Sequence, residues 1–464
     1  MARRRSRAMQ SPAQFASVHF AGLPLGDPRR SRRAITIASD LAADPAASIP
    51  RSSGDWCRTK AAYRFFHANA VTPDSVTSTH RSLVLAEARS RPVVLFLQDT
   101  TEISYGTPGV RKGLGPIGHG HKTDGLLMHT TLAIDPAADR AVLGVACLKV
   151  WARDGVRPHE PQHVRRARDD RESLKWATSV REVGAPPEGS RWIHVADREG
   201  DVWETFDACV KTGSDCVVRA CGSAARRKAA LADGGPSTRE DACELRDLAR
   251  SLRPGASCRV EKRGAAGGIA LSVSFAELTL FAPRQLPRST NTLRVWVVRA
   301  WEKDKDPSRD EEALEWVLLT TVPVRDAREA LDAVHWYAQR WTIEDYHKCL
   351  KTGCRVESRQ LESGERLAPL CAMLAVIATY VMSLKSVATV RPEAPATEVM
   401  PRAYVEALSK LRGIPMEELT AYRFRREVAR LGGFLARKSD GEPGWQTLWH
   451  GWRDLELIVT GASL

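Results

Sequence analysis

Two short, continuous apolar runs predict the central strands of a mixed α/β core. Residues 93–97 (VVLFL) have no polar interruption, which is typical of a strand buried on both faces. We expect this strand to end at Gln98-Asp99. Residues 192–196 (WIHVA) predict a second strand, which ends on Asp197. Each predicted strand therefore delivers an aspartate to its carboxyl end.

Further strands and helices fill the region around these two runs. Residues 127–134 and 141–150 flank a turn-like Asp-Pro segment and predict an antiparallel meander. Residues 172–183 are expected to form a helix before the second aspartate. Residues 222–315 are polar and rich in Gly and Arg, with strand-like pieces at 269–275 and 293–298, so we interpret them as a β-rich insertion.

The last third of the chain is predicted to be helical. A long helix is expected over about 325–352, followed by an apolar helix near 367–384. The apolar run within it, 370–384, has 15 residues, fewer than the roughly 20 that a membrane span needs. It is therefore interpreted as a buried core helix. Prolines at 392, 395 and 401 mark a linker into a small, helical C-terminal unit.

The N-terminal region combines helix signals with positive charge. Asp27-Pro28 predicts a helix start that places Arg29, Arg30 and Arg33 in the first turns, where cations oppose the helix dipole unless an anion docks nearby. A second helix, 56–67, carries Lys60 and Arg64. A solvated basic face is the simpler explanation, but two basic helices in one small unit favour DNA binding.

The amino-acid composition also favours a nucleic-acid partner. The 464 residues carry a net charge of +13, which favours a polyanionic partner such as nucleic acid. The 10 cysteines are scattered singly, which suits reduced thiols in a cytoplasm. No apolar stretch follows the basic start of the chain, so no secretory signal is expected.

The candidate chemistry lies in three carboxylates. Asp99 and Asp197, together with Glu344 on the later helix, can converge on one edge of a sheet and bind two divalent cations. On a continuous helix Tyr337, Arg340, Glu344 and Lys351 fall within an arc of roughly 60°, between two apolar flanks. The alternative for this stripe is a surface ladder of ion pairs.

Two other patterns are rejected as sites. Cys349, Cys354 and His347 have no second ligand pair at zinc spacing. The segment 113–118 matches a dinucleotide fingerprint, but it contains a proline and precedes a strand-like run, so no nucleotide cofactor is expected. A loop beside the active site is the better interpretation, with a cationic set that could contact DNA: Arg111, Lys112, His119, His121 and Lys122.

The stretch from Tyr337 through Arg340 and Glu344 to Lys351 is similar to the Y-R-E-K signature of the insertion-sequence-four family of bacterial DDE transposases. Other matching segments follow in the same order along nearly the whole chain, except for 222–315: 25–30 (LGDPRR), 62–65 (AYRF), 99–105 (DTTEISY), 197–201 (DREGD), 217–219 (VVR), 316–320 (WVLLT), 430–434 (RLGGF) and 445–452.

The resemblance implies an α/β, ribonuclease H-like core at 76–386, a helical domain at 1–75 that binds the element ends, and a helical dimerisation domain at 387–464. It implies cut-and-paste transposition through a DNA hairpin, catalysed by Asp99, Asp197 and Glu344 with two Mg²⁺ ions, for which Mn²⁺ could substitute. DNA phosphates would be held by Tyr337, Arg340 and Lys351, and Arg219 would face DNA. Trp316 would stack on a flipped base.

The expected partners are double-stranded DNA, as element ends and target, and a second copy of the chain. No membrane partner is expected, and a bacterial, nucleoid-associated protein fits this reading. Two alternatives stay open: a nuclease on the same core, and a non-catalytic or inhibitory transposase-derived DNA-binding protein.

Overall fold

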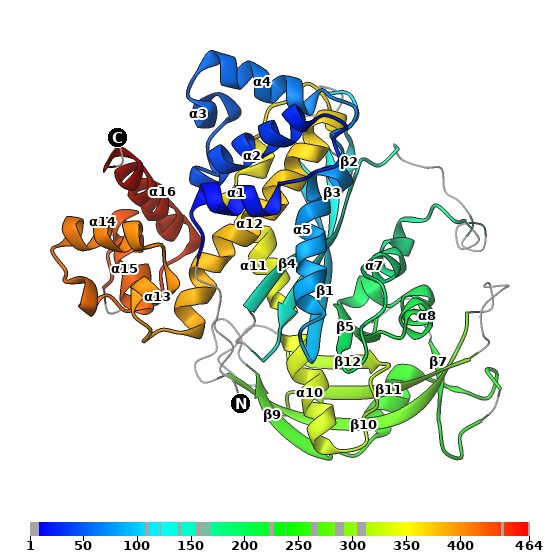
Figure 1. Cartoon of the computed structure of the whole chain (residues 1–464). Coiled ribbons are helices and arrows are strands. Elements are labelled where there is room, and N and C mark those ends of the chain that lie inside the picture. The colour runs from blue at the N-terminus through cyan, green and yellow to red at the C-terminus, as the bar shows by residue number, and fades with distance from the viewer. Residues whose placement is uncertain are drawn as a thin grey trace. The chain divides into compact units, whose positions relative to one another are not determined.

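The computed structural model describes residues 9–106, 111–118, 120, 122–137, 141–154, 161, 164, 168–221, 227–236, 238–260, 268–283, 292–303, 312–437 and 440–462. The arginines before residue 8, together with His119 and His121, lie outside these residues. The chain divides into two compact units (Figure 1). The first comprises Met1–Glu87, Thr100–Val156 and Glu344–Leu464, and the second comprises Ala88–Asp99 and Arg157–Ile343.

A twisted sheet forms the second unit. Its strand order is β1-β5-β6-β12-β11-β10-β7-β8, with β9 paired to β10. The β1-β5 and β5-β6 pairs are parallel, and the pairs from β6-β12 onward are antiparallel. The strands are β1 (Val93–Ser104), β5 (Arg191–Ala196), β6 (Asp215–Arg219), β7 (Lys228–Leu231), β8 (Cys243–Glu244), β9 (Ala256–Val260), β10 (Ile269–Phe281), β11 (Thr292–Trp301) and β12 (Glu315–Thr320).

Helices of the second unit cover this sheet. They are α7 (Lys175–Val183), α8 (Trp203–Thr212), α9 (Leu245–Ser251) and α10 (Ala327–Ala338), with short 3-10 turns η2 (Glu172–Leu174) and η3 (Arg198–Gly200). Trp176 and Phe206 from the helices pack with Leu278 and Val297 from the strands in one buried cluster. The expected insertion is therefore β-rich, and it shares a core with the central strands.

The first unit begins with a bundle of helices: α1 (Pro12–His19), α2 (Pro28–Ala43), α3 (Ile49–Ser53), α4 (Trp56–Phe66) and α5 (Pro73–Ala88). The predicted cap of α2 is confirmed, because the Asp27 carboxylate accepts a hydrogen bond from the backbone N–H of Arg29 at 2.8 Å. Residues Ile37 and Leu41 lie on the buried face of α2, which leaves the arginine-bearing face toward solvent.

The predicted antiparallel meander also belongs to the first unit. β3 (Thr123–Asp135) pairs with β2 (Gly115–Ile117) and with β4 (Ala141–Trp151). The apolar helix α12 (Gly364–Val390) packs against β4, and its window Gly364–Ser383 is long and apolar enough to cross a membrane. Because 89% of that window is buried inside the protein, the prediction of a core helix is confirmed.

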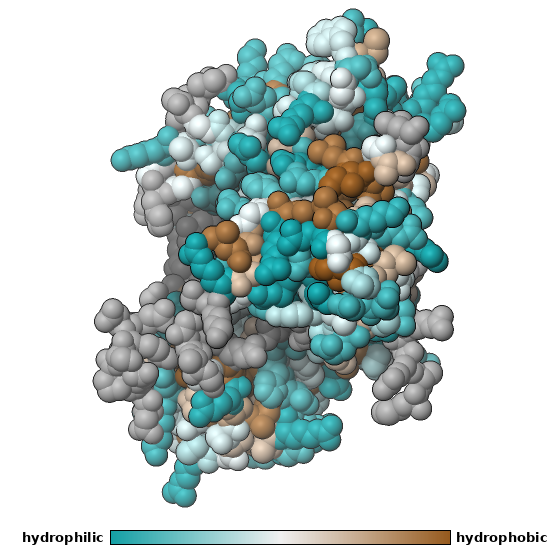
Figure 2. Space-filling view, turned by 90° about the vertical axis from the view of Figure 1, so that its left-hand side faces the viewer, coloured by the Kyte–Doolittle hydropathy of each residue, from teal (hydrophilic) through white to brown (hydrophobic). Residues whose placement is uncertain are grey.

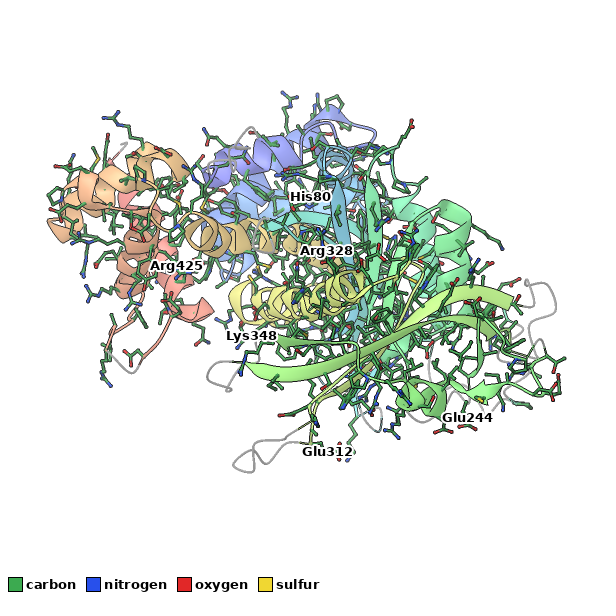
Figure 3. All side chains as sticks on the ribbon, turned by 90° about the horizontal axis from the view of Figure 1, so that it is seen from below. His80, Glu244, Glu312, Arg328, Lys348 and Arg425 are labelled. Carbon is green, nitrogen blue, oxygen red and sulfur yellow. The ribbon has the colours of Figure 1, made fainter. Side chains whose placement is uncertain are left out.

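The C-terminal part contains α13 (Ala396–Val399), α14 (Arg402–Arg412), η6 (Met416–Glu418), α15 (Ala421–Leu431) and α16 (Trp445–Ala462). Ion pairs link α14 to α15 and α15 to the segment that follows it. Arg425 on α15, labelled in Figure 3, pairs with Glu442. The buried Glu427 carboxylate accepts hydrogen bonds from Arg412 at 2.8 Å and from Arg430 at 2.9 Å.

Two predictions about elements were wrong. The long helix over 325–352 is broken: α10 ends at Ala338, α11 runs over Trp341–Lys348, and the π-helix η4 (Cys349–Gly353) follows. At the break the backbone N–H of Arg340 bonds to Tyr337 and that of Ile343 bonds to Arg340, a tighter i to i+3 pattern. β1 does not end at Asp99 either, because Thr100 and Ile103 favour an extended chain and the strand continues to Ser104.

Candidate active site and DNA interface

Asp99 lies on β1, and Asp197 follows the last residue of the neighbouring parallel strand β5, in the second unit. The register of the two strands ends at the pair Leu97–Val195, so both aspartates come two residues after paired positions. Asp197 also caps η3: one carboxylate oxygen accepts a hydrogen bond from the backbone N–H of Glu199 at 2.9 Å. Both side chains are only partly buried.

Arg340 lies opposite the first of these carboxylates. Its guanidinium Nη1 is 4.0 Å from Asp99 Oδ2, and the side chain is largely buried. The break between α10 and α11 places Arg340 just before the first turn of α11. A buried cation beside a carboxylate compensates its negative charge.

Tyr337 and Trp316 pack together on the same unit. Their rings meet edge to face, with centroids 5.0 Å apart, and both residues are buried. Burial raises the pKa of the Tyr337 hydroxyl, an effect opposed by Arg340 and Arg219. Arg219 donates a hydrogen bond from Nη2 to the backbone carbonyl of Glu315 at 2.9 Å, and burial lowers its pKa. Tyr337, Arg219, Arg340 and Trp316 are therefore brought together.

The carboxylate of Glu315, next to Trp316, is held by two arginines of the β-rich insertion. Arg250 on α9 approaches it at 2.7 Å and Arg299 on β11 at 2.9 Å. Hydrogen bonding, chiefly from Arg250, lowers the pKa of Glu315. The sequence alone did not identify these residues, because nothing in their spacing distinguishes them from other charges in the insertion.

A buried ion pair fixes the segment that follows Asp197. Asp201 pairs with Arg227 at 2.5 Å, with 1% and 8% of their side chains exposed. The other Asp201 oxygen accepts a hydrogen bond from the backbone N–H of Cys221 at 2.9 Å. The insertion thus contacts both the loop after Asp197 and the strand that carries Trp316. This pair was also missed, although Asp201 closes the matched DREGD segment.

Glu344 and Lys351 belong to the first unit. Glu344 is exposed on the first turn of α11, four residues after Arg340. Lys351 lies in η4, where the wider π-turn interrupts the expected α-helical stripe. Its ammonium is 3.6 Å from Glu357, which also accepts a hydrogen bond from the backbone N–H of Ser104 at 3.1 Å.

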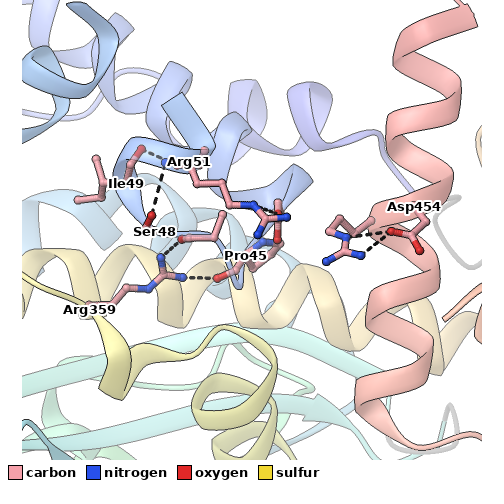
Figure 4. A network of polar contacts seen from close by, with 10 residues as sticks. Pro45, Ser48, Ile49, Arg51, Arg359 and Asp454 are labelled. Carbon is pink, nitrogen blue, oxygen red and sulfur yellow. Dashed lines mark hydrogen bonds and ion pairs between the residues drawn. The ribbon is translucent and has the colours of Figure 1, made fainter. Parts of the chain in front are cut away.

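A cavity of about 950 Å³ adjoins Lys351 within the first unit. Five cationic side chains line it, against the acids Asp44 and Glu357: Arg51, Lys351, Arg355, Arg359 and Arg453. Arg359 is buried and donates to the backbone carbonyls of Pro45, Ala47 and Cys354 (Figure 4), and burial lowers its pKa. The excess of positive charge suits an anionic ligand.

The cations predicted in the N-terminal helices lie at the surface. Arg29, Arg30, Lys60 and Arg64 are exposed, and Arg33 is partly exposed. The Arg30 guanidinium also donates to the Leu25 carbonyl at 2.9 Å. The structure thus brings these side chains to the faces of α2 and α4 that the core does not use.

The C-terminal helices expose apolar side chains. Leu411, Leu435, Leu457 and Ile458 are 38–65% exposed. Figure 2 shows the face that carries this part of the chain, where brown apolar areas lie among teal polar ones.

Asp99 and Asp197 by themselves provide only part of the ligands that a divalent metal ion needs. Asp99 on β1 and Asp197 directly after β5 offer carboxylate oxygens, the hard donor type that Mg²⁺ prefers. Within the described part of the chain, no three His, Cys, Asp or Glu side chains are already gathered around one point. The sequence predicts Glu344, in the first unit, as the third carboxylate.

Three family models match the chain: transposase DNA-binding over residues 12–71, transposase DDE domain over 194–381, and transposase Tn5 dimerisation domain over 376–464. Asp197 and Glu344 lie inside the DDE match, and Asp99 lies before it. A solved structure, the piggyBac transposase synaptic complex with hairpin DNA, is 9% identical with a TM-score of 0.35 over 83% of this chain and 78% of that chain. At this identity and TM-score, the similarity implies nothing about the function of this chain.

The matches agree with the arrangement of the molecule. A helical DNA-binding domain leads, an α/β core of the expected ribonuclease H-like class carries the DDE domain and its insertion, and a helical dimerisation domain closes the chain. The DDE domain implies dependence on a divalent metal ion, and the flanking domains imply DNA binding and a homodimer. The chain is therefore a DDE transposase, and its C-terminal domain matches the Tn5 dimerisation domain.

Proposed function

We propose that this transposase moves its element by cut-and-paste transposition, and that it belongs to the insertion-sequence-four group with Tyr337, Arg340, Glu344 and Lys351 as its Y-R-E-K signature. The proposal is supported by the parallel pairing of β1 with β5, after whose last pair Asp99 and Asp197 follow by two residues each, and by the 4.0 Å approach of Arg340 to Asp99. A plain ladder of surface ion pairs is a poor explanation of this stripe, since Tyr337 and Arg340 are both buried.

Asp99, Asp197 and Glu344 are the proposed metal ligands. When bound, two Mg²⁺ ions supply an activated water or 3′-hydroxyl and stabilise the leaving oxygen, and Mn²⁺ is expected to substitute. Glu344 is suited to the third position because its exposed side chain follows Arg340 by one helical turn. In the free protein Arg340 compensates the charge of Asp99.

The cationic and phenolic side chains are proposed to position DNA. Arg219, Arg340 and the Tyr337 hydroxyl would bind phosphates near the scissile bond. Lys351 and the cationic cavity of the first unit are proposed as further phosphate contacts. Trp316 is proposed to stack on a base that leaves the helix during hairpin closure. Because Trp316 is 3% exposed, it must first lose part of its contact with Tyr337.

The domain boundaries and cellular setting complete the proposal. Residues 1–75 would recognise the element ends, 76–386 would carry the chemistry, and 387–464 would pair two subunits so that both ends are cut together. Target DNA would bind the same dimer. None of the ten cysteines forms a disulfide, which supports a bacterial cytoplasm, in association with the nucleoid.

The test needs a specific duplex. Wild-type protein can be used to enrich binding sequences from a randomised duplex library, and the enriched duplex then serves as the end substrate. End-labelled substrate with Mg²⁺ should give nicked, hairpin and double-cut products in that order, followed by joining to a target plasmid. Nicking without hairpin or joining would favour a nuclease, and binding without any cleavage would favour a non-catalytic DNA-binding relative.

A further inference from the structure

Trp56 is the most exposed large apolar side chain among the described residues. It is 73% exposed at the first position of α4, inside the match to the transposase DNA-binding model. Tryptophan is highly buried on average, because its indole offers a large apolar surface. An indole left in solvent on a DNA-binding helix therefore needs an explanation in terms of a partner.

The local geometry of α4 directs Trp56 outward. Gly54, with φ of 77°, ends α3 and permits the sharp turn into α4. Asp55 caps α4 by accepting a hydrogen bond from the backbone N–H of Arg58 at 2.8 Å. The helix then buries a face that contains Ala62 and Phe65. Trp56 cannot turn into the core without breaking this packing.

Trp56 shares its exposed face with two cations. At about 100° per residue, Trp56, Lys60 and Arg64 fall within an arc of about 80°, and all three are exposed. The neighbouring cation Arg58 is engaged with Asp40, at 2.6 Å and 2.7 Å to its two oxygens. The outward face of α4 therefore consists of one indole followed by two available positive charges.

This order matches how a helix enters the major groove. Cations further along a helix bind phosphates at the groove wall, while residues of its first turn reach the base edges. An indole cannot make the bidentate hydrogen bonds of Arg or Asn, but its apolar face complements the 5-methyl group of thymine. The exposed face of α4 therefore suits double-stranded DNA better than an apolar protein surface.

We propose that Trp56 reads a thymine methyl group in the major groove of the element end, while Lys60 and Arg64 hold the flanking phosphates. The inference rests on the proposed recognition of ends by residues 1–75, and it names the side chain that supplies base discrimination. Because Trp56 makes few contacts within the protein, replacing it should not alter folding.

The experiment compares the full-length wild type, Trp56→Ala, Trp56→Phe and Lys60→Ala on the enriched duplex and on a random duplex of equal length. For Trp56→Ala the ratio of specific to random affinity should fall by roughly 4-fold, the effect expected when contact with a single methyl group is lost. Trp56→Phe should recover part of that ratio. Lys60→Ala should weaken both affinities and reduce the salt dependence by a slope of about 0.9. Val210→Ala, which truncates another exposed apolar residue, is the matched control.

A second readout locates the contact. Each thymine of the enriched duplex is replaced in turn by deoxyuridine, which removes only the methyl group. The wild type should lose affinity at one position, and Trp56→Ala should be insensitive there. An unchanged affinity ratio for Trp56→Ala, or equal deoxyuridine sensitivity in both proteins, would overturn the inference. Failure of the wild type to enrich any duplex would instead remove the proposed end recognition itself, and this inference with it.

Discussion

Arg340 holds its guanidinium 4.0 Å from the carboxylate of Asp99, at the point where α10 gives way to α11. Arg340 also opposes the rise that burial causes in the pKa of Tyr337, so it interacts with both Asp99 and the Tyr337–Trp316 pair. A cation in this position compensates the negative charge of the Asp99 carboxylate, and it also repels a metal ion that approaches that carboxylate. Arg340 therefore stabilises the metal-free site and opposes the binding of a metal ion.

Arg340→Gln is expected to raise the affinity of the DNA-free protein for Mn²⁺ by roughly 3- to 10-fold, because it removes a competing positive charge. Cleavage should nevertheless slow, since a phosphate ligand is lost. Electron paramagnetic resonance of free Mn²⁺ measures the affinity. Arg325→Gln, a highly exposed arginine of the same unit, is the control. Weaker Mn²⁺ binding in Arg340→Gln would contradict this account.

The buried pair Asp201–Arg227 should be worth more to stability than any exposed pair. Arg227→Ala leaves the Asp201 carboxylate buried without its cation, which should cost about 3–5 kcal/mol in the free energy of unfolding. Lys211→Ala, which breaks the surface pair with Asp207, should cost under about 1 kcal/mol. Urea unfolding of both variants measures the difference. Equal losses would mean that Arg227 does not brace the loop after Asp197.

Trp316 has two roles that substitution can separate. Trp316→Ala should destabilise the protein by about 3–5 kcal/mol, since the ring is buried against Tyr337. Among molecules that remain folded, nicking should stay near normal while hairpin formation slows by roughly 5- to 150-fold. Trp316→Phe should restore much of both properties.

Trp176→Phe, in the core of the same unit, is the matched control and should leave the ratio of nicking to hairpin formation unchanged. Time courses on end-labelled duplex resolve the two steps. Slowing of both steps to the same degree in Trp316→Ala would identify Trp316 as a packing residue alone.

Acid should destabilise the second unit through His194. Gln98 donates a hydrogen bond to its Nδ1 at 2.9 Å, and burial lowers the pKa of His194 to about 3. In the unfolded state the pKa of His194 is near 6.5, so below that pH the unfolded chain binds a proton that the folded protein does not bind. The free energy of unfolding is therefore highest above about pH 6.5 and falls as the pH drops toward 3. The loss at pH 5 should be about 2 kcal/mol relative to pH 7. His194→Gln should abolish this part of the pH dependence in urea titrations, and an unchanged dependence would refute the assignment.

The sequence predicted the elements whose signal is local. The cap at Asp27, the strands that lead to Asp99 and Asp197, and the burial of α12 follow from side-chain chemistry and apolar runs, and each is confirmed. The break at Gln339–Arg340 could not be predicted, because no proline or glycine marks it. Its backbone pattern instead accompanies a long-range contact between Arg340 and Asp99.

The arginines that pair with Asp201 and Glu315 could not be predicted from the sequence either. Arg227, Arg250 and Arg299 are three of many arginines in a polar insertion, and only the folded sheet brings them to Asp201 and Glu315. The prediction that Tyr337, Arg340, Glu344 and Lys351 share one stripe assumes an ideal, continuous α-helix. The π-turn at η4 changes the position of Lys351 relative to that ideal, which no periodicity argument can anticipate.

The most direct test of the central claim is Mg²⁺-dependent cleavage of the enriched end duplex by Asp99→Asn, Asp197→Asn and Glu344→Gln, with duplex affinity measured in parallel. Each substitution keeps the side-chain shape and removes one metal-binding charge. We predict that each lowers cleavage by at least about a thousandfold. Affinity for the duplex should stay close to that of the wild type, and the exposed-surface control Lys211→Ala should cleave normally. Wild-type cleavage by any one of the three carboxylate variants would contradict its place in the catalytic triad.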